Sequence, residues 1–378
     1  MLFWVTVVQF VWVLVVVGYL TVNMLHLARV NPVSGPLARY PFISVCVPAR
    51  NEERDIRACL ESLLNQEYPQ YEVIAVDDHS TDRTGEIMRS LAGKYSHLVC
   101  IEGQALPEGW LGKPFALHQA QRVARGEYLV FTDADPVFEP HALASAAHTM
   151  MTQNLDMLTL MPRAVFGSFW ERTVQPMMFG FIAALTRFGK VNDPDSSRSM
   201  GFGAFLMFRR EAYDAMGGHE SVRGEILEDI HLGKRTKRAG FRIWVADAKR
   251  LFSIRMYHSL GEIWRGWRKN VFLAFGRSVF WTMYFSAALL AFVLTPYGVA
   301  ALNLAAGAGN VSLWISLAAA FLVLISSQHL CDELELSRGY AFLFPLGALV
   351  TVGILINSMV HILGTGHSEW RGRKYSVR

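Results

Sequence analysis

Two carboxylates, Asp133 and Asp135, stand two residues apart at the end of an apolar segment. That segment, residues 128–132, is rich in residues that favour β-strands. A strand that delivers both acids to its carboxyl end places them where open α/β sheets bind ligands. Acidic oxygens on a short turn suit a hard divalent cation that also holds a diphosphate. Because Asp-x-Asp is also frequent by chance in loops, it becomes informative only through its surroundings.

The surroundings contain three further polar segments: Pro48–Glu53, Asp77–Asp82 and the pair Glu228–Asp229. Taken singly, each has an ordinary alternative, since Asn51 can cap a helix and acids at a helix start are favoured by the helix dipole. The first two segments each follow a strand-like run. Together with Asp133 and Asp135 they therefore fall on one edge of one predicted sheet. At such an edge Asp229 could act as a general base toward a hydroxyl group.

The elements that must position these groups alternate between strand and helix. Strands are predicted near 43–47, 71–76, 98–101 and 128–133, and helices near 51–65, 82–91 and 115–125. This alternation predicts an α/β fold with a doubly wound, mostly parallel sheet. Two more strand-like runs, 155–161 and 204–208, follow the Asp-x-Asp segment.

Other parts of the chain are strongly apolar. The 378 residues are 52% hydrophobic, and residues 1–28, 278–331 and 339–368 contain no Asp, Glu, Lys or Arg. A helix of about 20 apolar residues is what a bilayer core requires. The first stretch lacks a positive n-region and exceeds the apolar core of a signal peptide, so an uncleaved anchor is predicted. Basic residues follow it and none precedes it, which places residues from 29 onward in the cytoplasm.

The C-terminal block offers three apolar stretches, near 280–302, 311–330 and 341–363. If all three crossed the membrane, the basic tail at 365–378 would end outside, whereas its charge predicts that it stays inside. We therefore expect one stretch to be re-entrant or interfacial, and the stretch with Pro296 is the weakest candidate.

Two other segments suit the bilayer surface. The basic, aromatic segment 256–278 has the composition of an interfacial helix, with a solvated helix packed on the domain as the alternative. The apolar run 177–185 is too short to span and is predicted to be either a core helix or a surface helix.

Composition also excludes some classes of function. The net charge of +4 is modest and no basic tract is interleaved with aromatic residues, so nucleic acid is not an expected partner. The four cysteines show no paired spacing, which predicts neither a disulfide framework nor a zinc site.

In order and spacing, the polar motifs resemble those of family 2 glycosyltransferases. The resemblance covers roughly residues 42–250 and rests on Val47-Pro-Ala-Arg-Asn-Glu-Glu53, Asp77-Asp-His-Ser-Thr-Asp82, Asp133-Ala-Asp135 and Glu228-Asp229. Three further segments are similar to those of the membrane-bound branch, which glycosylates carotenoids and other apolar lipids: Trp110-Leu-Gly-Lys113, Trp264-Arg-Gly-Trp267 and Glu369-Trp-Arg-Gly-Arg-Lys-Tyr375. Ceramide glucosyltransferases are more distantly similar. The resemblance implies a GT-A fold, a nucleotide-diphosphate sugar (UDP- or GDP-hexose), Mg²⁺ or Mn²⁺, and inversion at the anomeric carbon.

By position in the motifs, the resemblance also implies roles for individual residues. The nucleoside would be held by Pro48, Ala49, Asn51, Glu52 and Asp78. Asp133 and Asp135 would bind ribose, diphosphate and metal, with Asp135 the direct ligand, and Asp229, beside Glu228, would be the catalytic base. Lys113 and the tail residues Arg371, Arg373 and Lys374 could neutralise the diphosphate, with contact to anionic lipid as an alternative. Arg265 and Trp267 could contact the diphosphate or the acceptor. The alternatives for these residues are a plain surface role or packing at the bilayer.

One departure from the family pattern bears on the product. Processive polysaccharide synthases of this family carry Gln-x-x-Arg-Trp, whereas this chain reads Glu262-Ile-Trp-Arg-Gly-Trp267, without the glutamine. The difference favours transfer of one sugar to each acceptor over polymer synthesis.

The expected organisation is an anchor (1–28), a GT-A domain (40–255), an interfacial helix (256–278), transmembrane helices (279–364) and a basic tail (365–378). The expected function is metal-dependent, inverting transfer of a hexose to a membrane lipid by a multi-pass plasma-membrane protein with a cytoplasmic catalytic domain. Two alternatives stay open. One is a polyprenyl-phosphate acceptor, for which Arg265, Arg268 and Lys269 could form a basic pocket, and the other is a non-catalytic membrane scaffold that keeps a nucleotide-binding domain.

Overall fold

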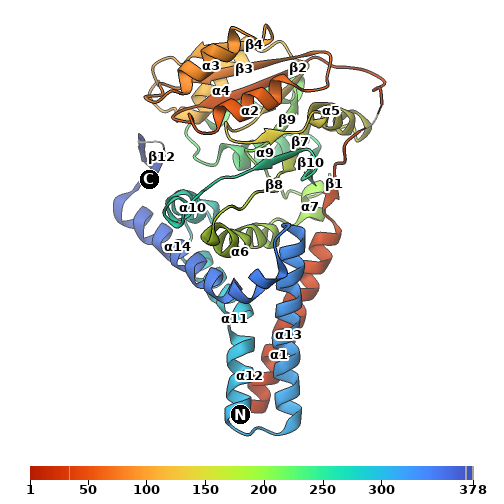
Figure 1. The fold of residues 1–378 in the computed structure, drawn as a ribbon, viewed down its shortest axis with the longest axis vertical. Helices are drawn as coiled ribbons and strands as arrows, with labels where there is room; N and C mark the ends of the chain where they lie inside the picture. Colours follow the sequence, from red (N-terminus) through yellow and green to blue (C-terminus); the bar gives the residue numbers. More distant parts are fainter. Residues whose placement is uncertain (34, 371–372, 377–378) are drawn as a thin grey trace. The chain divides into compact units, whose positions relative to one another are not determined.

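The computed structural model describes residues 1–33, 35–370 and 373–376, and the chain separates into two compact units (Figure 1). We call residues 1–26, 166–186 and 257–378 the helical unit. Residues 27–165 and 187–256 form the sheet unit.

The sheet unit is built on an eight-stranded sheet with the order β1-β10-β7-β9-β5-β2-β3-β4. Its strands are β1 (Ala28–Arg29), β2 (Ile43–Ala49), β3 (Tyr71–Asp77), β4 (Leu98–Glu102), β5 (Tyr128–Phe131), β7 (Met157–Met161), β9 (Leu206–Arg209) and β10 (Ile243–Asp247). All neighbours are parallel except β9, which is antiparallel to β5 and β7. The predicted α/β class with a mostly parallel sheet is therefore confirmed.

A second, three-stranded sheet and several helices complete this unit. The small sheet joins β6 (Val137–Phe138), β11 (Phe252–Ile254) and β8 (Arg163–Ala164). The helices are α2 (Ile56–Leu64), α3 (Thr84–Ala92), α4 (Gly112–Val123), α5 (Ala142–Thr152), α7 (Phe188–Asn192), α8 (Arg210–Ala215), the 3₁₀ helix η1 (Gly218–Val222) and α9 (Glu228–Arg238).

Burial explains why the central segments form strands. Every residue of β2 is buried, as expected of a strand covered on both faces of a parallel sheet. Val45 and Val47 of β2 share one apolar core with Leu60 of α2 and Met88 of α3. Each such fully buried aliphatic side chain contributes about 1.5–3 kcal/mol relative to exposure. This core fixes the strands whose carboxyl ends carry the polar motifs.

A buried polar network fixes the entry into β5. The Ser44 hydroxyl donates to Glu72 at 2.7 Å and accepts from the backbone N–H of Gly126 at 2.7 Å. Arg125 also donates to Glu72 from its backbone and its guanidinium. A Cβ at position 126 would lie 2.5 Å from the backbone nitrogen of Ser44, so glycine is required there. The network holds β5 against β2, and β5 leads directly into Asp133.

The helical unit contains the long apolar helices. Its elements are α1 (Leu2–Leu25), α6 (Phe169–Leu185), α10 (Leu260–Ala274), α11 (Val279–Val293), α12 (Thr295–Ala305), α13 (Asn310–Glu333), the 3₁₀ helix η2 (Arg338–Leu343), α14 (Phe344–Thr365) and the strands β12 (His367–Trp370) and β13 (Arg373–Ser376). Among the described residues, three helical segments are long and apolar enough to cross a membrane: Leu2–Leu25, Val311–Glu333 and Arg338–Thr365. The pair α10 and α11 is bent by 119° and forms either a broken span or a re-entrant loop.

The stretch that contains Pro296 is divided in this structure. α11 ends at Val293 and α12 begins at Thr295, with Pro296 in the first turn of α12. Proline fits the first turn of a helix because its missing N–H would have no intrahelical partner there. The apolar run predicted near 280–302 is therefore two helices, neither of which is among the three long segments.

Polar contacts join α10 to α14 within the helical unit. Trp264 Nε1 donates to Asn357 Oδ1 at 3.0 Å, and the backbone N–H of Phe272 donates to Ser358 at 3.2 Å. α6 is capped by Ser168 and Glu171 and packs closely on α14, where a Cβ at Gly347 would lie 2.2 Å from the carbonyl oxygen of Thr173. The apolar run predicted at 177–185 thus forms the second half of α6.

Candidate active site

The carboxyl ends of β2 and β3 form one polar edge of the sheet unit. Ala49 lies beside Asp77 in parallel register, and the backbone N–H of Asp78 donates to the Ala49 carbonyl at 2.8 Å. Asp78 is 2% exposed. Pro48 and Ala49 are the last two residues of β2, so the residues proposed to hold a nucleoside share this edge.

The loops after these two strands are fastened to each other. Asn51 has a φ of 54°, a conformation that asparagine tolerates better than most residues. Its Oδ1 accepts from the backbone N–H of Thr81 at 2.8 Å, and the backbone N–H of Glu52 donates to Thr84 Oγ1 at 2.8 Å. Both residues therefore order the edge, and their contact with a nucleoside stays a prediction.

Four acidic side chains and one lysine gather near the end of β5. We call Asp133, Asp135, Glu228 and Asp229 the carboxylate cluster. Lys113, in the first turn of α4, places its Nζ 2.7 Å from Asp133 Oδ1 and 2.7 Å from Glu228 Oε1. The Glu228 side chain is 5% exposed and that of Asp133 is 35% exposed. The structure thus joins the Asp-x-Asp turn to the Glu-Asp pair through a lysine.

Asp229 is oriented by backbone groups. Its Oδ2 accepts from the N–H of Gly203 at 2.8 Å, and its Oδ1 accepts from the N–H of Ile230 at 2.8 Å. The Thr132 hydroxyl donates to the carbonyl of Ala204 at 2.7 Å, which ties the turn after β5 to the same loop. Asp229 is therefore held in a fixed position by the segment that precedes β9.

Two glycines that the sequence analysis did not identify allow Asp229 to lie close to the segment that precedes β9. A Cβ at Gly201 would lie 2.1 Å from the carbonyl oxygen of Asp229. A Cβ at Gly203 would lie 2.9 Å from Lys113 Nζ and 3.3 Å from Asp229 Oδ2. The signal that could have identified them is the Gly-Phe-Gly triplet at 201–203, just before a predicted strand.

The electrostatics of Asp229 suit proton transfer near neutral pH. Burial and the neighbouring charge of Glu228 raise the pKa of Asp229 to about 7, although Lys113 acts in the opposite direction. An ideal catalytic base has a pKa close to the working pH. For Lys113, burial would lower the pKa, but the charges of Asp133, Glu228 and Asp229 outweigh it and raise the pKa well above the usual value, so this amine stays a cation.

Asp133 and Asp135 fit a divalent cation that is held jointly with a ligand. Burial, followed by the charges of Asp133 and Glu52, raises the pKa of Asp135 well above its usual value. No group of three or more His, Cys, Asp or Glu side chains in the described residues could hold a metal alone. Sites for Mg²⁺ commonly use one or two carboxylates and take further ligands from substrate phosphates. Asp135 and Asp133, of which Asp133 is also paired with Lys113, match that donor set.

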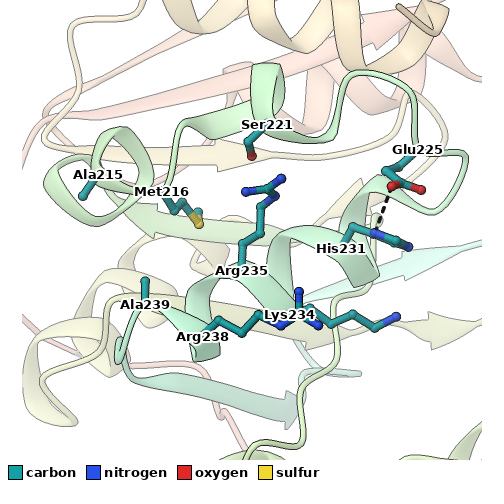
Figure 2. Close-up of a pocket in the computed structure, with 9 residues that line it drawn as sticks. All are labelled: Ala215, Met216, Ser221, Glu225, His231, Lys234, Arg235, Arg238 and Ala239. Atoms are coloured by element: carbon teal, nitrogen blue, oxygen red, sulfur yellow. Dashed lines mark ion pairs between the residues drawn. The ribbon is translucent and has the colours of Figure 1, made fainter.

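A basic hollow of about 600 Å³ lies against a different part of α9 (Figure 2). It is lined by Ala215, Met216, Ser221, Glu225, His231, Lys234, Arg235, Arg238 and Ala239, so none of the carboxylate cluster takes part. Figure 2 shows Arg235 extending toward Ser221, and the ion pair of His231 with Glu225 at 3.4 Å. Cations in the last turn of a helix are stabilised by its dipole, which accounts for Arg235 and Arg238 structurally.

The remaining candidates belong to the helical unit or lie outside the described residues. Arg265 and Trp267 lie on α10 in the helical unit, and their contact with a diphosphate or an acceptor stays a prediction. Arg371 lies outside the described residues, and Arg373 begins β13. Within the sheet unit, Lys113 and the carboxylate cluster lie together near the carboxyl end of β5.

Comparison with known proteins shows what this chain is similar to. Residues 44–217 match the family described as Glycosyl transferase family 2. A protein of Staphylococcus aureus (strain USA300) named 4,4'-diaponeurosporenoate glycosyltransferase is 25% identical over 351 residues, which cover 89% of this chain and 88% of that protein. A protein of the same name from Staphylococcus haemolyticus (strain JCSC1435) is 28% identical over 240 residues, 62% of each chain.

One solved structure resembles the whole chain in fold. It is a mannosyltransferase from Pyrobaculum calidifontis in complex with GDP-Man and Mn²⁺, which is 18% identical, with a TM-score of 0.52. The likeness covers 96% of this chain and 99% of that one. At this identity the likeness establishes the fold alone.

Proposed function

We propose that this chain, a glycosyltransferase whose residues 44–217 match family 2, moves a single hexose from a nucleotide-diphosphate sugar to an apolar membrane lipid. The observation that carries the proposal is that Lys113 Nζ forms ion pairs with both Asp133 and Glu228. These contacts bring the Asp-x-Asp turn, the candidate metal site, close to the candidate base Asp229. We further propose that this chemistry takes place at the cytoplasmic face of the plasma membrane. The basic residues after the first apolar helix support that orientation.

The sugar nucleotide would lie along the carboxyl edge of β2, β3 and β5. Its nucleoside would contact the ends of β2 and β3, where Asp78 offers a nearly buried carboxylate. A Mg²⁺ or Mn²⁺ ion held by Asp133 and Asp135 would neutralise the charge that develops on the leaving diphosphate. The complex of the mannosyltransferase relative with GDP-Man and Mn²⁺ supports this combination.

Asp229 would remove the proton from the acceptor as its oxygen attacks the anomeric carbon. The two backbone N–H groups that bind its oxygens fix the direction of the carboxylate. Glu228 is paired with Lys113, so Asp229 is the member of the pair that is not bound to a cation. A base that acts directly on the acceptor, with no enzyme nucleophile, inverts the anomeric configuration.

The rest of the chain supports an apolar acceptor. Three described helical segments could span a membrane, and a lipid acceptor that stays in a bilayer must be met there by a soluble sugar nucleotide. The staphylococcal relatives are named for 4,4'-diaponeurosporenoate, and we extend that chemistry to a carotenoid, a terpenoid, or an acceptor resembling a sphingolipid or glycerolipid.

The pH dependence of transfer should report Asp229. Only the ionised carboxylate can accept a proton, and the pKa of Asp229 is raised to about 7. We therefore expect kcat/KM to fall about tenfold per pH unit below this value and to level off above it. The measurement is a series of initial rates between about pH 5 and pH 9 with a labelled sugar nucleotide. A flat profile down to pH 5 would contradict a base with this pKa.

The acceptor class is tested with membranes that contain the protein. After incubation with labelled UDP- or GDP-hexoses, label should move into material that organic solvent extracts, and its mass should equal that of an apolar lipid plus one hexose. Membranes without the protein are the control. Label in a polyprenyl phosphate would replace the acceptor in this proposal, and label only in water-soluble material would overturn a lipid acceptor.

A further inference from the structure

Lys113 stands where its charge is unfavourable for its own helix. It is the second residue of α4, whose first turn contains no acid. The amino end of a helix carries a partial positive charge, so a cation there is disfavoured. Its side chain is nevertheless only 20% exposed. The contacts that compensate are the two ion pairs to Asp133 and Glu228, each at 2.7 Å.

Lys113 is a single positive charge among several carboxylates. Within the described part of the chain, it is the one basic side chain that forms ion pairs with the carboxylate cluster, which contains four acids. Asp133 is shared, since it contacts Lys113 and is also one of the two acids that fit a divalent cation. A fixed positive charge beside Asp133 repels a metal ion, because like charges a few ångströms apart interact strongly in a partly buried site.

We propose that Lys113 is a built-in counter-ion that holds Asp133 and Glu228 together in the free enzyme and weakens the binding of a divalent cation until the diphosphate of the sugar nucleotide arrives. The inference rests on the proposed function and assigns Lys113 a positioning role. A diphosphate brings negative charge that pairs with the lysine and the metal at once. Metal and sugar nucleotide are then bound cooperatively, and each raises the affinity for the other by the same factor.

The proposal is tested by titrating Mn²⁺ into the full-length, detergent-solubilised protein. Binding is measured as the loss of the electron paramagnetic resonance signal of free Mn²⁺. Titrations are run without nucleotide, with UDP and with GDP. Lys113→Met, which keeps most of the side chain and removes the charge, should bind Mn²⁺ alone on the order of tenfold more tightly than the wild type. The same variant should show a smaller gain in Mn²⁺ affinity when the nucleotide is added.

Two control variants separate charge from structure. Lys113→Arg keeps the charge and should retain the cooperative pattern, and Lys94→Met, at an exposed position of the sheet unit, should behave as the wild type. If Lys113→Met does not fold, as judged by its melting curve, Lys113→Gln takes its place. Mn²⁺ affinity that stays equal or falls in a folded, charge-free variant overturns the proposal. A wild type that transfers hexose to lipid in the presence of EDTA overturns it too, while leaving the glycosyltransferase intact.

Discussion

Asp229→Asn is expected to reduce sugar transfer by about 10³-fold while leaving the affinity for the sugar nucleotide nearly unchanged. The substitution keeps the size and shape of the side chain but removes its ability to accept a proton, and it leaves an oxygen for only one of the two backbone N–H groups that bind Asp229. Asp229 forms no ion pair with Lys113, so its neutralisation leaves the contacts of Asp133 and Glu228 in place. The loss should therefore appear in kcat, and the dissociation constant of the nucleotide should stay within about threefold of the wild type.

The measurement combines initial rates with equilibrium titration of UDP or GDP in the presence of Mn²⁺. Asp214→Asn, at an exposed position of α8, is the matched control and should have full activity. Equal loss of rate and nucleotide affinity in Asp229→Asn would mean that this carboxylate holds the sugar nucleotide and does not act as the base.

The carboxyl edge of the sheet could be predicted because its signals are local. β2 and β3 are apolar runs that end in polar residues, and each prediction came within about two residues of the observed strand. Parallel pairing then forces Ala49 and Asp77 to the same edge. Asp133 was expected at the end of its strand, and the strand ends two residues earlier, at Phe131.

The contacts that complete the site could not be predicted in the same way. Gly203 and Asp229 are 26 residues apart, and nothing in the local sequence pairs them. The antiparallel strand β9 between β5 and β7 brings the glycine loop back to the carboxylates. The partners of Lys113 could not be predicted either. The sequence suggested a contact with the diphosphate, whereas in the structure Lys113 forms ion pairs with Asp133 and Glu228.

Composition also could not decide where α6 belongs. Its apolar run fits either a domain core or a membrane surface, because both environments bury the same side chains. In the structure, residues 166–186 belong to the helical unit, and the residues on either side of them belong to the sheet unit. α6 packs on α14 where Gly347 meets Thr173, and the choice between a core helix and a surface helix for residues 177–185 stays a prediction.

Asp135→Asn is expected to produce a different kind of loss. If Asp135 is the direct ligand of the cation, its amide cannot supply a negative oxygen, and both Mn²⁺ binding and Mn²⁺-dependent nucleotide binding should weaken. Transfer should fall by about 10²–10³-fold, the usual effect of removing a group that stabilises charge in the transition state. Asp229→Asn, by contrast, should bind Mn²⁺ and nucleotide together as the wild type does.

Asp135→Asn should also change the stability of the free protein in the opposite direction. The raised pKa of Asp135 means that its ionised form is disfavoured, first by burial and then by the charges of Asp133 and Glu52. A neutral amide removes this repulsion, so the ligand-free variant should melt at a higher temperature than the wild type at neutral pH, as is common where a site is strained for function. Nucleotide with Mn²⁺ should then raise the Tm of the wild type more than that of the variant. An equal rise in both proteins would show that Asp135 is not a ligand of the metal, and a lower Tm in the free variant would show that its carboxylate stabilises the fold.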